Sequence, residues 1–107
     1  MPAKKTVIAN WKMSLSLAET LVLAKKFKEK FDDFDKGEIV ICPASPALSQ
    51  VAKILKGGRL RLGAQNVFWE DRGSYTGEVS ADMLVETGCQ YIIIGHRERR
   101  KYLFENY

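Results

Sequence analysis

Four short runs of apolar residues recur along the chain, each followed by a stretch with helical periodicity. The runs are continuous rather than alternating in hydrophobicity, which is typical of strands in a parallel sheet that is covered on both faces. Strand and helix alternate regularly, so we expect an α/β fold built from four βα units. The four predicted strands span residues 6–9, 39–42, 61–65 and 91–94.

Capping signals mark the helices between these strands. Ser16 and Glu19 have the spacing of a capping box and predict a helix that runs to about Phe31. One face of that helix carries the stripe Leu17, Leu21, Ala24, Lys28 and Phe31. Ser45 before Pro46 predicts a second helix through Leu55, Ser80 caps a third that Gly88 ends, and the last covers residues 98–104.

Length and composition restrict the class of protein. The 107 residues, 46% hydrophobic and 28% charged, describe one globular domain over residues 1–107. A complete eight-unit barrel needs about 250 residues. The apolar runs are too short for a membrane span, and we expect no membrane partner. Cys42 and Cys89 lack metal-ligand spacing, so we expect no metal site and predict buried free thiols in a reducing, cytoplasmic compartment.

Polar residues follow the predicted strands, where parallel α/β folds bind their ligands. Asn10 and Lys12 follow the first strand, and this pair suits the binding of an anionic oxygen. Gln65 and Asn66 follow the third, and their amides either orient a neighbouring lysine or a partner loop, or serve only as turn residues. A solvated lysine is the alternative for Lys12.

His96, the only histidine, follows the fourth strand and precedes a helix. A lone histidine is often structural, but a helix start disfavours the imidazolium, so a neutral ring there would donate a hydrogen bond to an oxyanion. Glu98 lies in the first turn of that helix and reaches a nearby lysine. The basic run 99–101 lacks interleaved aromatic residues, so we expect no nucleic-acid partner.

Together these segments resemble the triosephosphate isomerases, in family order across essentially the whole chain. The matching motifs are Ala9-Asn10-Trp11-Lys12-Met13, Gly63-Ala64-Gln65-Asn66-Val67, Gly73-Ser74-Tyr75-Thr76-Gly77-Glu78-Val79-Ser80 and Gly95-His96-Arg97-Glu98-Arg99-Arg100. The resemblance implies the (β/α)4 half of a TIM (β/α)8 barrel. It also implies the glycolytic and gluconeogenic interconversion of dihydroxyacetone phosphate and glyceraldehyde 3-phosphate, without metal or cofactor.

The resemblance assigns roles to individual residues. Lys12 stabilises the charge of the enediolate and the substrate phosphate, and Asn10 positions Lys12 and the substrate oxygen. His96 is the neutral electrophile that polarises the carbonyl, a role for which this family is itself the standard example. Glu98 supports Lys12.

The resemblance also implies an oligomer formed through the loop over residues 66–79. In the family this loop inserts into a twin subunit, where Thr76 steadies Asn10 and His96. Gln65 and Asn66 anchor the interface from the receiving side. The loop residues assigned to this interface are Tyr75, Thr76, Gly77 and Glu78.

Two departures limit these expectations. Arg97 stands where the family most often has serine, and its charge would lower the proton affinity of a nearby carboxylate base. The resemblance covers only four of eight βα units, and the family's glutamate base, closing lid and phosphate-binding turns belong to the other four. We therefore expect the chain alone to be nearly inactive.

Three interpretations follow from the sequence. In the first, the chain is the amino-terminal half of an isomerase and is active with a complementary carboxyl-terminal half. In the second, it is a non-catalytic half-barrel that self-associates through exposed strand edges. The third, a flavodoxin-like binder, needs a phosphate-binding loop after the first strand, but residues 10–14 contain no glycine.

Overall fold

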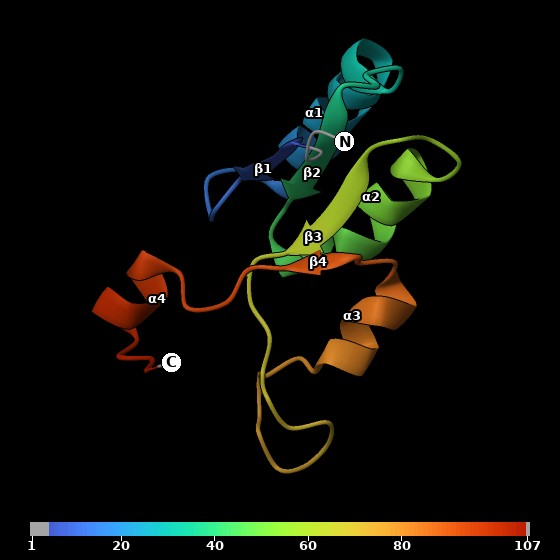
Figure 1. The fold of residues 1–107 in the computed structure, drawn as a ribbon. Coiled ribbons are helices and arrows are strands. Elements are labelled where there is room, and N and C mark those ends of the chain that lie inside the picture. The colour runs from blue at the N-terminus through green and yellow to red at the C-terminus, as the bar shows by residue number, and fades with distance from the viewer. Residues whose placement is uncertain (1–4, 107) are drawn as a thin grey trace.

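The computed structural model describes residues 5–106. They form one parallel sheet, and helices connect each strand to the next along the chain (Figure 1). The strand order is β1-β2-β3-β4, so each strand lies beside its neighbour in sequence. This order confirms the predicted α/β architecture of four βα units. The elements are β1 (Lys5–Asn10), α1 (Leu17–Phe31), β2 (Gly37–Cys42), the 3-10 helix η1 (Ser45–Ala47), α2 (Leu48–Leu55), β3 (Arg61–Ala64), α3 (Ala81–Thr87), β4 (Tyr91–Ile92) and α4 (Arg97–Tyr102).

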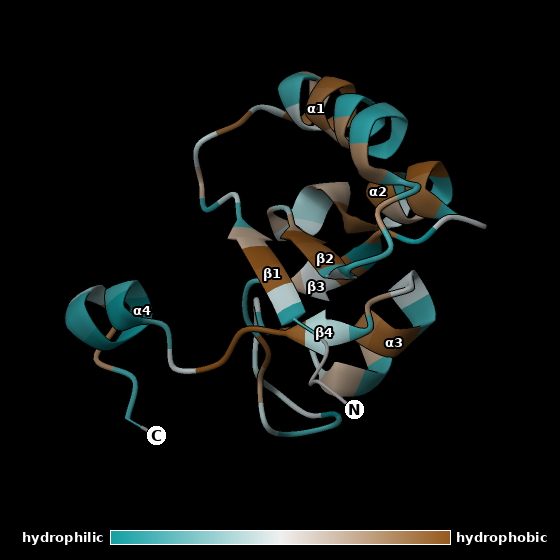
Figure 2. Cartoon of the chain, turned by 45° about the horizontal axis from the view of Figure 1, so that its top comes forward, coloured by the Kyte–Doolittle hydropathy of each residue, from teal (hydrophilic) through white to brown (hydrophobic). Residues whose placement is uncertain are grey.

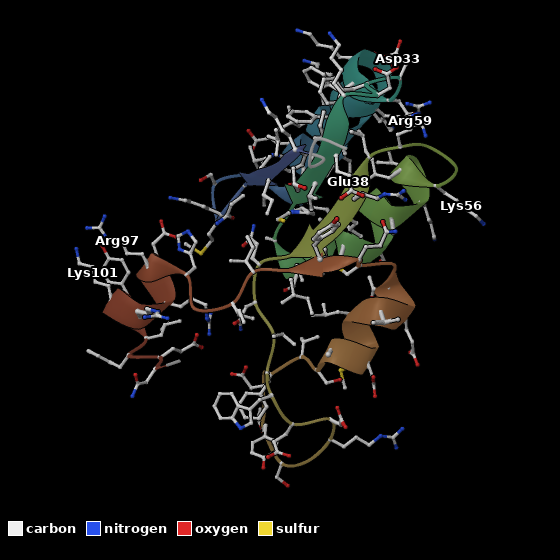
Figure 3. The ribbon with its side chains drawn as sticks, viewed as in Figure 1. Asp33, Glu38, Lys56, Arg59, Arg97 and Lys101 are labelled. Atoms are coloured by element: carbon white, nitrogen blue, oxygen red, sulfur yellow. The ribbon has the colours of Figure 1, made fainter. Side chains whose placement is uncertain are left out.

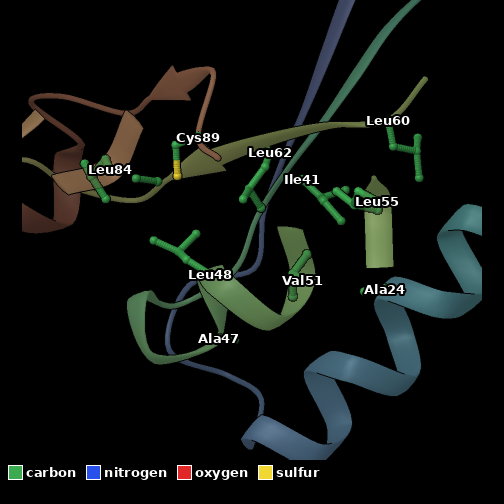
Figure 4. Packing of buried hydrophobic residues seen from close by; sticks show 11 residues of the cluster. Ala24, Ile41, Ala47, Leu48, Val51, Leu55, Leu60, Leu62, Leu84 and Cys89 are labelled. Carbon is green, nitrogen blue, oxygen red and sulfur yellow. The ribbon is translucent and has the colours of Figure 1, made fainter. Parts of the chain in front are cut away.

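The hydrophobic core lies between one face of the sheet and helices α1, α2 and α3 (Figure 4). Ile41 of β2 is completely buried, and it packs in one cluster with Leu62 of β3 and Val51 of α2. Ala24 and Leu84 bring α1 and α3 to the same cluster. Side chains alternate between the two faces of a strand, so the residues between these core positions point to the opposite face of the sheet.

The capping box of α1 is present, as predicted. Ser16 Oγ accepts a hydrogen bond from the Glu19 backbone N–H at 3.1 Å, and Glu19 Oε1 accepts one from the Ser16 N–H at 2.9 Å. The predicted apolar stripe is partly wrong, because Leu17 is 45% exposed while Phe27 packs against the core. Phe27 lies there because the ring of Trp11 meets it edge-on, with centroids 5.4 Å apart.

The start of the second helix differs from the prediction. Ser45 does not cap it; Ala44 is the N-cap of η1 and makes no side-chain hydrogen bond. Pro46 lies inside this tight turn, and α2 follows from Leu48. A short 3-10 helix therefore connects β2 to α2.

The carboxyl-terminal part of the chain is less regular than predicted. β4 ends at Ile92, not at residue 94, and the last helix covers Arg97–Tyr102 with His96 as its N-cap. Phe104 has φ of +56°, which takes the chain out of the helical conformation. α4 is hydrophilic, has no buried residue and lies apart from the other three helices (Figure 2).

Both cysteines are free and buried, as predicted. Burial raises the pKa of Cys42 to about 11, with a smaller contribution from Cys89. In the part of the chain from residue 5 to residue 106, no helix is long and apolar enough to cross a membrane.

Candidate functional site

A cavity of about 670 Å³ lies at the carboxyl ends of the strands. Segments that follow all four strands contribute to its wall, since Lys12 follows β1, Ala44 follows β2, Gln65 follows β3 and His96 follows β4. This is the end of the sheet at which parallel α/β folds bind ligands. The cavity therefore gathers the polar strand-end residues that the sequence singles out.

Lys12 is held at this cavity by its backbone as well as by its ammonium group. It has φ of +54°, a conformation that costs energy for a residue with a side chain and persists where the surroundings enforce it. Asn10 Oδ1 accepts a hydrogen bond from the Lys12 N–H at 2.9 Å. Gln65 Nε2 donates to the Lys12 carbonyl at 2.9 Å and to the Cys42 carbonyl at 2.8 Å. Gln65 thus joins the segments that follow β1, β2 and β3 and fixes the backbone carbonyl of Lys12.

An ion pair at the cavity connects the loop after β1 to helix α4, which follows β4. Lys12 Nζ lies 2.6 Å from Glu98 Oε1, and both side chains are about half exposed, at 52% and 44%. The hydrogen bond from Lys12 lowers the pKa of Glu98, and the charges of Lys12, His96 and, least of all, the exposed Arg97 lower it further. Glu98 is therefore an ionised partner of Lys12 at neutral pH rather than a proton donor.

His96 lies beside this pair at the start of α4. Its Nδ1 lies 3.2 Å from the Glu98 backbone N–H and 3.0 Å from Glu98 Oε2. The first contact needs an unprotonated Nδ1, which leaves the proton of a neutral ring on Nε2. The second contact is favourable only when Nδ1 carries a proton. The Glu98 backbone and carboxylate are thus both placed against Nδ1, which leaves Nε2 of the ring for other partners.

The loop over residues 66–79 reaches the cavity at both of its ends but not at its tip. Asn66, Gly77 and Glu78 line the cavity, whereas Tyr75 and Thr76 are exposed outside it. Within this loop Phe68 stacks on Trp69, which is 73% exposed. The structure thus places the predicted catalytic and substrate-binding residues around one cavity and leaves the loop tip facing solvent.

Asn66 adds an unused hydrogen-bond acceptor. Its Oδ1 is buried and has no hydrogen-bond partner in the described part of the chain. A buried acceptor without a partner is costly, so it marks a place where a donor from outside would be stabilised.

Sequence reasoning missed the wall that α4 and the segment after it form. Arg99, Tyr102 and Leu103 line the cavity, and a bidentate ion pair between Arg99 and Glu105 fixes the segment after α4. Its N–O distances are 2.9 and 2.6 Å. A spacing of six residues is not a helical side-chain spacing, so no periodic rule predicts this pair. Residues 5–106 contain no cluster of three or more histidine, cysteine or acidic side chains that would hold a metal.

Comparison with known proteins gives the family context of this arrangement. The family model described as triosephosphate isomerase matches residues 5–107. The triosephosphate isomerase of Dictyoglomus turgidum is 48% identical over 102 residues, which are 95% of this chain and 41% of that protein. That of Gloeothece citriformis is 50% identical over 101 residues, 92% of this chain and 42% of that protein.

A solved structure extends the comparison to the fold. The crystal structure of triosephosphate isomerase from Bartonella henselae superposes with a TM-score of 0.83 at 36% identity, over 97% of this chain and 43% of that chain. This match confirms the predicted half-barrel. The chain spans about two fifths of the length of these relatives. It belongs to the triosephosphate isomerase family, as a segment homologous to the amino-terminal part of those enzymes.

Proposed function

We propose that this chain supplies the amino-terminal part of an active site that interconverts dihydroxyacetone phosphate and glyceraldehyde 3-phosphate. The observation that carries the proposal is the meeting of Lys12, His96 and Glu98 at one cavity, with a Lys12–Glu98 distance of 2.6 Å. The reaction moves a proton between adjacent carbons through an enediolate. A cation and a neutral hydrogen-bond donor are the groups that stabilise such an anion.

Each residue takes a role that its contacts support. Lys12 binds the phosphate and the enediolate oxygen, and Asn10 holds the lysine loop through the Lys12 N–H. His96 donates from Nε2 to the substrate oxygens while its Nδ1 faces the Glu98 N–H. Glu98 holds the ammonium of Lys12 in place. We assign no metal and no cofactor to this chemistry.

The proposed chemistry also needs a base that removes the carbon-bound proton. Among the described residues, two carboxylates line the cavity. Glu98 is already occupied by Lys12, and Glu78 lies in the loop rather than at a strand end. We therefore propose that turnover is very low until a complementary carboxyl-terminal segment supplies the base and a lid.

Complementation tests this function. The chain is mixed with a second polypeptide that carries the part of the Dictyoglomus turgidum sequence which it does not match, and isomerisation is followed in a coupled assay. We expect activity from the mixture and almost none from either chain alone. In the mixture, His96→Ala lowers turnover by about two to four powers of ten.

A pair of matched variants controls this experiment. Lys12→Met removes the cation at the cavity, whereas Lys26→Met removes an exposed lysine of α1. We expect the first to abolish activity and the second to leave it unchanged. A folded, stably associated mixture without isomerase activity would contradict the proposed function.

The loop over residues 66–79 is proposed as a contact with a second subunit. Its tip, with Tyr75 and Thr76, is exposed, and Trp69 presents an apolar ring to solvent. Gln65 and Asn66 are proposed on the receiving side, where the unused Asn66 Oδ1 would accept a donor. We further propose that the protein acts in the cytoplasm, on a triose phosphate substrate and without nucleic-acid or membrane partners.

Exposed apolar residues on the outer strands favour a second candidate function, a non-catalytic half-barrel that associates with copies of itself. Val7 and Ile8 of β1 are 56% and 52% exposed, and Ile94 beyond β4 is 62% exposed. Edge strands with exposed apolar side chains favour association. A stable monomer at micromolar concentration in sedimentation velocity would exclude this candidate.

A further inference from the structure

Three polar side chains that line no part of the cavity meet at the other end of the sheet. They come from three consecutive strands: Glu38 from β2, Arg61 from β3 and Tyr91 from β4. The Tyr91 hydroxyl donates a hydrogen bond to Glu38 Oε2, and Arg61 Nε lies 3.8 Å from Glu38 Oε1. Figure 3 shows Glu38 on the strand that lies between β1 and β3.

The side chain of Tyr91 leaves β4 on the sheet face that carries Val40 and Cys42, as the surroundings of Gly63 show. Gly63 is the register partner of Tyr91. A β-carbon at Gly63 would lie 3.4 Å from Tyr91 Cβ, 3.1 Å from Val40 Cγ1 and 2.6 Å from Cys42 Sγ. These side chains therefore share the face opposite to the core. The missing side chain at Gly63 leaves room for the Cys42 thiol on this face, and Tyr91 extends across β3 on the same face to reach Glu38.

The backbone attaches β4 to the sheet over a short length and through β3 alone. Tyr91 and Ile92 pair with Gly63 and Ala64, and two flanking bonds, of 2.8 and 2.9 Å, also end on β3 carbonyls. α4, which follows, buries no residue and so gives β4 little additional support. Tyr91 carries the only polar side chain of β4, and its hydroxyl makes the connection to β2.

This attachment determines where His96 and Glu98 lie. Both follow β4, whereas Lys12 follows β1, which pairs with β2 along its whole length of six residues. The separation of Lys12 and Glu98 therefore depends on how β4 is placed relative to β2. The Lys12–Glu98 ion pair is about half exposed, and exposed ion pairs contribute little to holding elements together.

We propose that Tyr91 is a positioning residue, whose hydrogen bond to Glu38 fixes β4 against β2 and thereby holds His96 and Glu98 beside Lys12. This inference rests on the proposed function in one respect, because it takes Lys12 and His96 to be the reacting groups. A hydrogen bond to an ionised acceptor is stronger than one between neutral groups. The bond to Glu38 also raises the pKa of Tyr91, so the hydroxyl keeps the proton that it donates.

The single histidine of the chain provides the measurement. The ring ¹⁵N signals of His96 need no assignment, because the sequence has no other histidine. We expect Lys12→Met to change the chemical shifts of these signals. The spectra are recorded at about pH 8, where an ordinary imidazole is neutral. The size of the change then measures the contact between Lys12, which follows β1, and His96, which follows β4. In a Tyr91→Phe background we expect the Lys12→Met shift to fall by about half or more, as for any coupling whose connecting contact is removed.

Conservative variants separate positioning from general stability. Glu38→Gln keeps an acceptor oxygen for the Tyr91 hydroxyl, although a neutral and therefore weaker one, and should retain more of the shift than Glu38→Leu, which should behave like Tyr91→Phe. Ser49→Ala removes a hydroxyl from an exposed position of α2, away from the site and the loop, and should leave the shift unchanged. Tyr91→Phe keeps the ring, so it decides the question even where Glu38→Leu does not fold.

Two results would overturn the inference. The first is that Lys12→Met changes the His96 signals by the same amount in the Tyr91→Phe background as in the parent chain. The second is that Lys12→Met does not change the His96 signals of the parent chain at all, since the contact that Tyr91 is proposed to hold would then be absent. The measurement uses no substrate and no complementary chain. Its failure is therefore distinguishable from failure of the proposed isomerase activity.

Discussion

Replacement of Ser16 by alanine tests how much the start of α1 depends on its cap. Ser16 Oγ accepts a hydrogen bond from the Glu19 N–H, and the alanine variant loses this acceptor. The reciprocal bond, from the Ser16 N–H to Glu19 Oε1, uses the backbone of residue 16 and survives the substitution. The variant therefore removes one half of the capping box and leaves the other half.

The size of the effect follows from this geometry. Replacing a serine cap by alanine costs about 0.5 to 2 kcal/mol in general. One of the two bonds remains and Ser16 is exposed, so we expect the free energy of unfolding to fall by about 1 kcal/mol, near the middle of that range. For a chain of this length this corresponds to a lowering of Tm by about 4 to 8 °C.

Urea denaturation followed by circular dichroism measures this loss. Ser14→Ala makes the same chemical change two residues earlier, at an exposed position in the loop before the helix, and should leave stability nearly unchanged. The hydrogen bond from the Ser16 backbone N–H, which both variants keep, lowers the pKa of Glu19. The stability that this carboxylate contributes is therefore present above the ordinary glutamate pKa and is lost as the pH falls through the lowered pKa of the folded chain. A difference between the two serine variants of less than about 0.3 kcal/mol would refute the reasoning, because loss of a serine cap costs at least about 0.5 kcal/mol.

Two further predictions concern the core. Ile41 is completely buried, so Ile41→Ala should lower the free energy of unfolding by about 2 to 5 kcal/mol and Ile41→Val by about 0.5 to 1.5 kcal/mol. Equal losses for the two variants in urea denaturation would contradict this, because they would show that the core around residue 41 closes the space left by the removed methyl groups. The folded chain keeps the Cys42 proton up to a pH of about 11, whereas the unfolded thiol loses it near its ordinary value, so stability should decrease as the pH rises between those values. Cys42→Ala should remove part of that decrease in urea midpoints measured across this range, and an unchanged slope would contradict the assignment.

Local signals in the sequence were sufficient for the features whose partners are close in the chain. The spacing of Ser16 and Glu19 predicts the capping box, because both bonds form within one turn of helix. The strand ends likewise predict the cavity, since all parallel strands end at the same edge of the sheet. Asn10, Lys12 and His96 line one cavity for this reason.

Features that depend on packing between distant segments could not be predicted in this way. Phe27 replaces Leu17 on the buried face of α1, because Trp11 from the loop after β1 lies against it. Tyr91 and Glu38 are 53 residues apart and meet only because β2 and β4 both flank β3 in the folded sheet. Spacing rules describe a single helix or strand, and neither contact lies within one.

The candidate site and the edges of the sheet are physically linked. Lys12 follows β1 and His96 follows β4, and in the described residues these two strands each pair with a neighbour on one side only. The inner strands contribute Gln65, which holds the lysine loop, and Glu38, which holds β4 through Tyr91. A segment that pairs with the free edges would therefore fix the two strands that position the proposed reacting groups. Completion of the sheet would thus stabilise the arrangement of Lys12, His96 and Glu98 that the chain already forms at the cavity. Activity is expected from the complemented protein because the added segment also supplies the base.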